Sequence, residues 1–86
     1  AALQGQQFDQ AVASFTKASE VDPKQHVIWA QLAESHMGVA KTKTGAEQEQ
    51  ALAKAYEAYT KAIELKADDP GYHNNYALAL ARGKKF

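Results

Sequence analysis

The stretch TKASEV at residues 16–21 decides the fold, because it returns as TKAIEL at residues 60–65, a shift of 44 positions. A second pair, QGQQF at residues 4–8 and RGKKF at residues 82–86, is separated by 78 positions. The longer shift equals one unit of about 34 residues followed by one of about 44. Repeats of this length are typical of stacked arrays, whose units bury their apolar faces against one another and cannot do so alone. The sequence therefore predicts a repeat protein.

The composition predicts that the repeated unit is helical. The 86 residues include eighteen alanines and only two prolines, and the β-branched residues do not cluster. Alanine favours helix more than any other residue, whereas proline breaks it. We therefore expect an all-α fold with four helices. A chain this short, with fewer than three complete repeats, buries little surface, so we also expect it to be a fragment of a longer protein.

The charge balance argues against two classes of partner. Ten basic residues offset ten acidic residues, so the formal net charge is zero and gives no reason to expect nucleic acid or an anionic membrane as a partner. The sequence has no apolar run long enough to cross a bilayer and no stretch that resembles a signal peptide. The absence of cysteine excludes disulfides and thiolate metal sites, but it does not indicate a compartment.

Apolar residues that recur at spacings of three and four predict the positions of the helices. We expect helices at about residues 8–21, 26–43, 45–67 and 70–82, with the fourth ending at Gly83.

Three short motifs mark the boundaries between these helices. Asp22-Pro23 ends the first helix, since proline offers no N–H and disfavours helix at the residue before it. Thr44 and Glu47 have the spacing of a capping box, in which each side chain satisfies a backbone donor. Asp69 is the expected N-cap of the last helix, with Pro70 in the first turn, where its missing N–H costs nothing.

The second expected helix carries the clearest packing face. Its apolar stripe consists of Ile28, Trp29, Leu32, Ala33, His36, Val39 and Ala40, and its opposite face carries Gln31, Glu34, Ser35 and Gly38. Trp29 is the expected buried aromatic residue, so Trp29→Ala should cost about 3–5 kcal/mol. Ala33 is the expected small residue at a helix crossing, and the shift of 44 gives Ala77 the same role in the last helix.

This pattern resembles the tetratricopeptide repeat family. The resemblance rests on W-x-x-L-A-x-x-H at residues 29–36 and A-x-x-x-Y at residues 55–59. Some positions depart from the family pattern. His36 stands where the family usually has an aromatic residue, His73 stands where the middle repeat has tryptophan, and the closing proline comes late, at Pro70.

The resemblance covers the whole chain and implies an α-solenoid of antiparallel helical hairpins, wound into a right-handed superhelix. Residues 1–25 would contain the second helix of a first repeat, residues 26–69 a complete repeat, and residues 70–86 the first helix of a third. The middle repeat is about ten residues longer than usual, so we expect an extended hairpin at residues 41–50 that projects beyond the stack by roughly 7 Å. We expect this extension to be dispensable for folding, although a docking role for it stays open.

In this family the first helices of successive repeats line a concave groove that binds peptides or proteins. By matching positions, the resemblance implies seven groove residues in this chain: Val27, Ala30, Glu34, Met37, Asn74, Leu78 and Arg82. Some members of the family grip a C-terminal carboxylate with cationic and amide side chains, but Glu34 would repel a carboxylate. We therefore do not expect that mode of binding.

The sequence contains no pattern that indicates catalysis. The histidines lack the spacing of a helical metal site; we expect His36 to pack in the stripe, and His26 and His73 to pair with the aspartates that precede their helices. Ser35 and His36 are neighbours in the sequence, but neighbours on a helix point about 100° apart and make a poor nucleophile and base. We expect no enzyme, no catalytic residue, no metal site and no cofactor.

These observations favour a non-catalytic protein–protein interaction module, a scaffold or adaptor that holds a peptide or protein surface in its groove. The alternative is a structural element of self-assembly, a homo-oligomer that stacks head to tail, or by swapping, through its terminal half-repeats. A third interpretation is a regulatory appendage of an enzyme whose catalytic domain lies outside these residues. The sequence indicates neither the partner, nor the pathway, nor the localisation.

Overall fold

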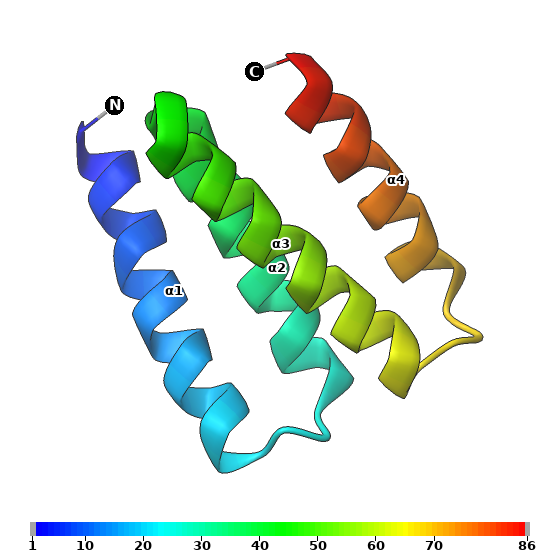
Figure 1. The fold of residues 1–86 in the computed structure, drawn as a ribbon. Helices are drawn as coiled ribbons and strands as arrows, with labels where there is room; N and C mark the ends of the chain where they lie inside the picture. Colours follow the sequence, from blue (N-terminus) through cyan, green and yellow to red (C-terminus); the bar gives the residue numbers. More distant parts are fainter. Residues whose placement is uncertain (1, 86) are drawn as a thin grey trace.

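Four α-helices account for nearly all of the chain. The computed structural model describes residues 2–85, with side chains from Gln7 onward, and in this part of the chain it contains no strand. The helices are α1 (Ala2–Val21), α2 (His26–Thr42), α3 (Gly45–Leu65) and α4 (Pro70–Lys85) (Figure 1). The expectation of an all-α protein with four helices is therefore confirmed.

Two of the expected helix ends are wrong. Helix α1 begins at Ala2, several residues before the expected start at residue 8, and α4 continues through Gly83 to Lys85. Glycine costs only about 1 kcal/mol in a helix, so it does not by itself end one. Gly83 also has a packing role, because the Tyr56 hydroxyl occupies the space in which a Cβ at this position would lie.

The expected caps at the starts of α3 and α4 have different outcomes. Asp69 caps α4 as expected, since its Oδ1 accepts a hydrogen bond of 2.8 Å from the Gly71 N–H. Thr44 precedes α3, but its side chain makes no capping hydrogen bond, so the predicted capping box is wrong. The reason is local: Gly45 has a φ of +62°, which removes the helical backbone that a capping box needs directly after the cap. Glu47 instead lies 3.9 Å from the Lys43 ammonium.

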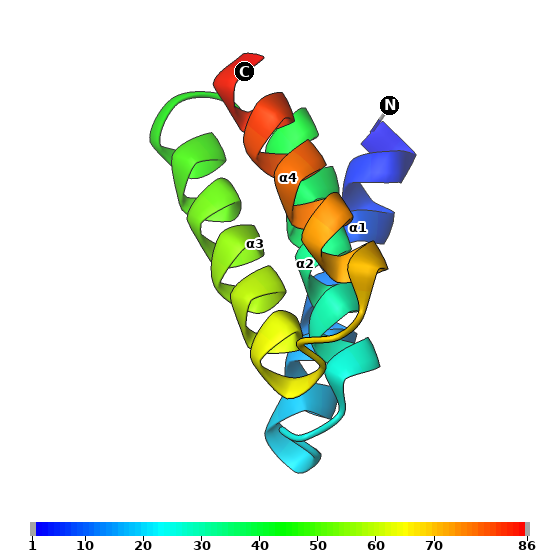
Figure 2. The same ribbon diagram turned by 90° about the vertical axis from the view of Figure 1, so that its right-hand side faces the viewer.

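Helix α2 is the centre of the molecule, with α1 packed on one side and α3 on the other (Figures 1 and 2). Eight of its residues are buried: Ala30, Leu32, Ala33, Ser35, His36, Met37, Gly38 and Ala40. Ala33 is fully buried, as its expected place at a helix crossing requires. Ser35 and Gly38 were expected on the exposed face, which is wrong, because the Phe8 ring of α1 packs directly against Gly38.

The hydrophobic core lies mainly between α2 and α3. It consists of Leu32, Ala33, Met37, Ala40, Ala51, Leu52, Ala55, Ala58, Tyr59 and Ala79. Six of these ten residues are alanines, so helix backbones can approach closely. Trp29 packs against the core but is only half-buried, which is less than the sequence led us to expect.

The turn between α1 and α2 and the turn between α3 and α4 share two backbone hydrogen bonds. The shift of 44 converts one set into the other: Asp22 N to Ala18 O (2.9 Å) becomes Lys66 N to Ala62 O (3.0 Å), and Gln25 N to Asp22 O (3.3 Å) becomes Asp69 N to Lys66 O (3.2 Å). The repeat in the sequence is thus a repeat in backbone structure at these two turns.

A ring N–H closes each of these turns in the same way. The Trp29 Nε1–H donates to the Pro23 carbonyl at 2.7 Å, and 44 residues later His73 Nε2 lies 3.1 Å from the Ala67 carbonyl. A carbonyl can only accept, so His73 must carry a proton on Nε2 to make this bond. Histidine therefore replaces tryptophan at this position without loss of the donor.

The extended hairpin at residues 41–50 does not project as expected. It consists of the last turn of α2, a short connection and the first turns of α3, tied together by a hydrogen bond of 2.9 Å from Gln48 Nε2 to the Ala40 carbonyl. The start of α1 and the end of α4 reach the same end of the molecule (Figures 1 and 2). Both flanking helices are longer than expected, so they accompany the hairpin along its length.

Within the part of the chain that the structure describes, no helix combines the length and apolar character that crossing a membrane requires.

Candidate functional site

One concave feature lies between α2 and α4 and has a volume of about 320 Å³. It is lined by Phe8, Glu34, Met37, Gly38, Lys41, Tyr59, Asn75, Leu78, Ala79 and Arg82, and we call this set the α2/α4 pocket. Helix α2 provides one wall and α4 the other, while Tyr59 of α3 and Phe8 of α1 complete the lining.

Four of the seven expected groove residues meet in this pocket: Glu34, Met37, Leu78 and Arg82. Val27, Ala30 and Asn74 do not line it. Ala30 is buried, and Val27 is exposed near the start of α2. The pocket residue of the first turns of α4 is Asn75, because Asn75, Leu78, Ala79 and Arg82 share one helix face at spacings of three and four.

The Tyr59 side chain lies at the base of the pocket and is only 4% exposed. Burial raises the pKa of Tyr59 above its ordinary value, the Glu34 carboxylate raises this pKa further, and the Arg82 guanidinium lowers it. Tyr59 therefore stays neutral at physiological pH. It offers a hydroxyl that can both donate and accept, close to one carboxylate and one guanidinium.

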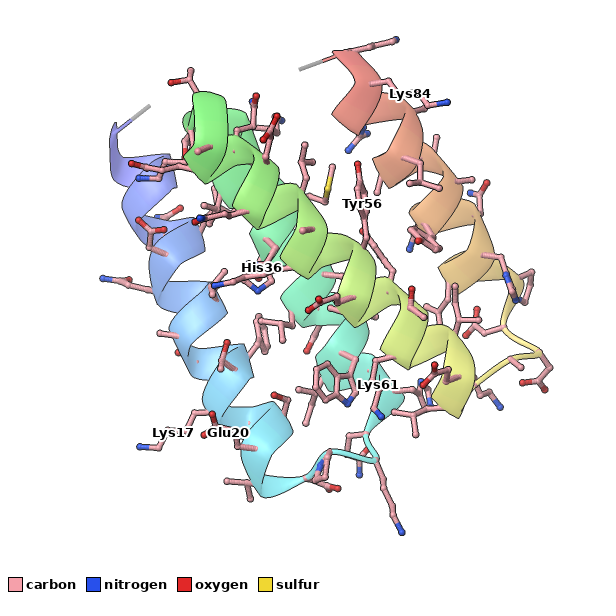
Figure 3. All side chains as sticks on the ribbon, in the orientation of Figure 1. Lys17, Glu20, His36, Tyr56, Lys61 and Lys84 are labelled. Carbon is pink, nitrogen blue, oxygen red and sulfur yellow. The ribbon has the colours of Figure 1, made fainter. Side chains whose placement is uncertain are left out.

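A cluster of three tyrosines fixes α4 on α3 beside the pocket. The rings of Tyr59 and Tyr76 are stacked with centroids 5.9 Å apart, and Tyr56 approaches Tyr76 at the same distance with a tilt of 43°. The Tyr56 side chain extends from α3 toward α4, where its hydroxyl lies 3.5 Å from the Ala79 carbonyl (Figure 3). Stacked and tilted aromatic pairs of this kind contribute about 0.5–1.5 kcal/mol each beyond the area they bury.

A contact between His26 and Tyr72 joins the first turns of α2 and α4. His26 Nδ1 lies 2.6 Å from the Tyr72 hydroxyl, and the two rings meet edge to face with centroids 5.5 Å apart. Burial, together with Asp69 and Glu34, raises the pKa of Tyr72, so this phenol keeps its proton. The expected pairing of His26 and His73 with nearby aspartates is wrong, since His26 contacts Tyr72 and His73 contacts the Ala67 carbonyl.

A second hollow lies on the other side of α2, between α1 and α3, and has a volume of about 550 Å³. Val12, Trp29 and Leu32 give it an apolar base, and charged side chains such as Lys54 and Glu57 line its rim. His36 lies here between the two helices (Figure 3).

His36 is 8% exposed, which agrees with the expectation that it packs. Its burial lowers the pKa of His36 below the ordinary value, and Lys54 lowers it further, whereas Glu57 raises it. Ser35, the neighbour of His36 in sequence, donates its hydroxyl to the Gln31 carbonyl at 2.9 Å. The two side chains therefore do not form a nucleophile and base pair with each other. Among the described residues, no three His, Cys, Asp or Glu side chains are grouped so that they could hold a metal ion.

No family model matches this sequence, and neither the search of curated proteins nor the search of solved structures found a match.

Proposed function

We propose that the chain is a non-catalytic interaction module, a scaffold or adaptor that binds a peptide or protein segment in the α2/α4 pocket. The observation that carries this proposal is the meeting of Glu34, Asn75 and Arg82, from two helices, in the lining of one pocket that also contains the buried Tyr59. Glu34 is far in the sequence from Asn75 and Arg82, and no packing requirement explains a carboxylate, an amide and a guanidinium around one hollow.

The chemistry of the pocket suits a polypeptide. Met37, Leu78 and Ala79 offer apolar contact for one or two side chains, in a volume near the lower end of the range for ligand sites. The Asn75 amide can donate to a backbone carbonyl and accept from a backbone N–H at the same time. Glu34 and Arg82 would then select charged side chains of opposite sign along the bound segment.

We further propose that the fold is a repeat array of the tetratricopeptide type, an α-solenoid wound into a right-handed superhelix. Two observations support this: the turns after α1 and α3 have matching hydrogen bonds, and Ala33 is fully buried at the position where the repeat needs a small residue. In such an array α2 and α4 are the first helices of successive repeats, and the pocket lies on the concave side.

A peptide selection tests the proposed binding function. The 86-residue chain would be screened against a random peptide display library, and the Kd of the enriched peptides measured by fluorescence anisotropy. Asn75→Ala should raise Kd by about tenfold, because it removes hydrogen bonds in a partly desolvated site. The matched control is Asn74→Ala, a change of the same chemistry one residue away and outside the pocket, which should leave Kd unchanged.

Two results would count against this proposal. If no peptide is enriched from the library, the proposed binding function is contradicted. Equal effects of Asn75→Ala and Asn74→Ala would place the binding surface elsewhere on the molecule.

A further inference from the structure

We infer that the outer face of α4 binds, in a second copy of this chain, the α1 face that carries Ala11, Ser14, Phe15 and Ala18, in the way that α2 binds α3 within one copy. This inference does not depend on the pocket function, because none of the residues proposed for the contact lines the α2/α4 pocket. It starts from the internal repeat, which relates α1 to α3 and α2 to α4 by the shift of 44.

The template is the interface between α2 and α3, which contains most of the core. On the α2 side its central residues are Ala33, His36, Met37 and Ala40, and all four are buried. The shift converts them into Ala77, Leu80, Ala81 and Lys84 of α4, and all four are exposed. The outer face of α4 thus carries the pattern of an interface that the four described helices leave uncovered.

Helix α1 carries the complementary face. The α3 residues that α2 covers include Ala55, Ala58, Tyr59 and Ala62, which are all buried. Their equivalents in α1 are Ala11, Phe15 and Ala18, which are half-buried, and Ser14, which is exposed. The α1 face is therefore apolar and small at the same positions, and part of its surface is still accessible.

The exposure of single residues points to the same pairing. Leu80 is 39% exposed although it occupies the position of the buried His36, and Ala77 is exposed although Ala33, its equivalent, is fully buried. These two residues lie one turn apart and, with Ala81, form a continuous apolar surface on α4. A helix of the same type as α3 fits this surface, and among the four described helices α1 is of that type and has an accessible face.

One position does not match the template. Lys84 stands where the template has the buried Ala40. It lies in the last turn of α4, so its long side chain can carry the ammonium past the end of the helix to water. The mismatch should weaken the contact without preventing it, and Lys84→Ala should tighten it.

The contact is head to tail, because it joins two different surfaces. Each added copy leaves one free α4 face and one free α1 face, so assembly continues unless the rotation between copies closes a ring. Where two copies meet, α4 of one would lie beside α2 of the next across the new junction. The junction would then contain a new pocket equivalent to the α2/α4 pocket, with one wall from each copy.

Sedimentation equilibrium of the purified chain, from about 10 μM to about 1 mM, tests this inference. The mean mass should rise with concentration. Ala77→Glu places a carboxylate in the contact. Because this charge would be buried without a partner, the Kd of association should rise by about tenfold or more. Ala53→Glu is the matched control: it makes the same substitution at an exposed alanine of α3, outside the α2/α4 pocket and both proposed contact faces, and should leave association unchanged.

A mixing experiment then identifies the partner surface. Ser14→Glu blocks the α1 face at an exposed residue, so both blocked variants should fold and each alone should stay monomeric. An equimolar mixture of Ala77→Glu and Ser14→Glu should form a 1:1 dimer that grows no further, because each partner supplies the face that the other lacks. Far-UV circular dichroism of each variant checks that helix content is retained.

Three results would overturn the inference. A constant monomer mass up to the highest concentration would show that the α4 face binds no second copy. A rising mass that Ala77→Glu does not reduce would place the contact elsewhere. Association that Ala77→Glu abolishes but Ser14→Glu leaves intact would show that α4 pairs with α4 in a symmetric dimer.

Discussion

Helices α2 and α4 occupy equivalent positions in the repeat, yet one is buried and the other is largely exposed. Helix α2 has eight buried residues, whereas in the described part of α4 only Ala79 is buried. The two helices share a pattern of small and apolar residues, but α2 lies between α1 and α3, while α4 packs mainly on α3 and meets α2 at the His26–Tyr72 contact. The apolar stripe of a helix therefore indicates which face can be buried, and the number of neighbouring helices decides whether it is.

The largest difference between the two helices is expected at Trp29 and its equivalent His73. Trp29→Ala removes a half-buried ring and the hydrogen bond to the Pro23 carbonyl, and should lower the free energy of unfolding by about 2–3 kcal/mol. This is less than the value expected from the sequence, because part of the ring is exposed. His73→Ala should cost under about 0.5 kcal/mol, since His73 is exposed. Urea denaturation measures both, and equal losses would contradict the difference in burial.

The next largest difference in stability between α2 and α4 is expected when leucine replaces the alanine at the helix crossing. Ala33→Leu adds three carbons to a fully buried site and should destabilise the chain by about 1–3 kcal/mol through overpacking. Ala77→Leu makes the same change at the equivalent exposed position and should stay within about 0.5 kcal/mol of the parent. Thermal unfolding at low protein concentration compares them. If Ala33→Leu unfolds at the same temperature as the parent, the helix crossing is packed less tightly than the complete burial of Ala33 indicates.

Two helical glycines give a smaller contrast. A Cβ at Gly38 would collide with several atoms of the Phe8 ring, so the whole ring must move, whereas a Cβ at Gly83 would mainly meet the Tyr56 hydroxyl at the end of its side chain. Gly38→Ala should therefore cost about 1 kcal/mol despite its gain in helix propensity. Gly83→Ala should be close to neutral, and a stability loss larger than that of Gly38→Ala would show that α4 is held more rigidly than its burial suggests.

The smallest effect is a dependence of stability on pH that the buried His36 gives to α2. Because burial lowers the pKa of His36, the unfolded chain binds its proton at a higher pH than the folded chain does. The free energy of unfolding should therefore be unaffected by His36 above about pH 6.5, the ordinary pKa of histidine. It should fall as the pH drops below that value toward the lowered pKa of the folded chain. The slope cannot exceed about 1.4 kcal/mol per pH unit.

His36→Leu should reduce this pH dependence, and leucine is the residue that the chain itself uses at the equivalent Leu80. Leu80→His is the matched control: it places a histidine at an exposed site and should add no comparable dependence. Urea denaturation at several pH values between about pH 5 and about pH 8 gives the free energy of unfolding of both variants and distinguishes their pH dependence. An unchanged pH profile in His36→Leu would assign the effect to another group.

The sequence predicted the features that depend on local pattern. The start of α2, the Asp69 cap and the burial of Ala33 follow from spacing and capping chemistry, and the structure confirms them. The sequence did not predict the contact between His26 and Tyr72, since residues 46 positions apart meet only through the packing of three helices. It also favoured Asn74 over Asn75, because one residue rotates a side chain by about 100° and position matching does not fix helix rotation.

The placement of the aromatic residues gives the two parts of the molecule separate optical signals. The sole tryptophan lies on the α1/α3 side of α2, and the tyrosine cluster of Tyr56, Tyr59 and Tyr76 lies between α3 and α4. Near-UV circular dichroism of tyrosine therefore reports the docking of α4, while tryptophan fluorescence reports the packing of α1 on α2. Since α4 buries little surface, it is the segment that detaches first under mild denaturant. Unfolding followed by the two signals would then run in two steps, a readout that needs no added label.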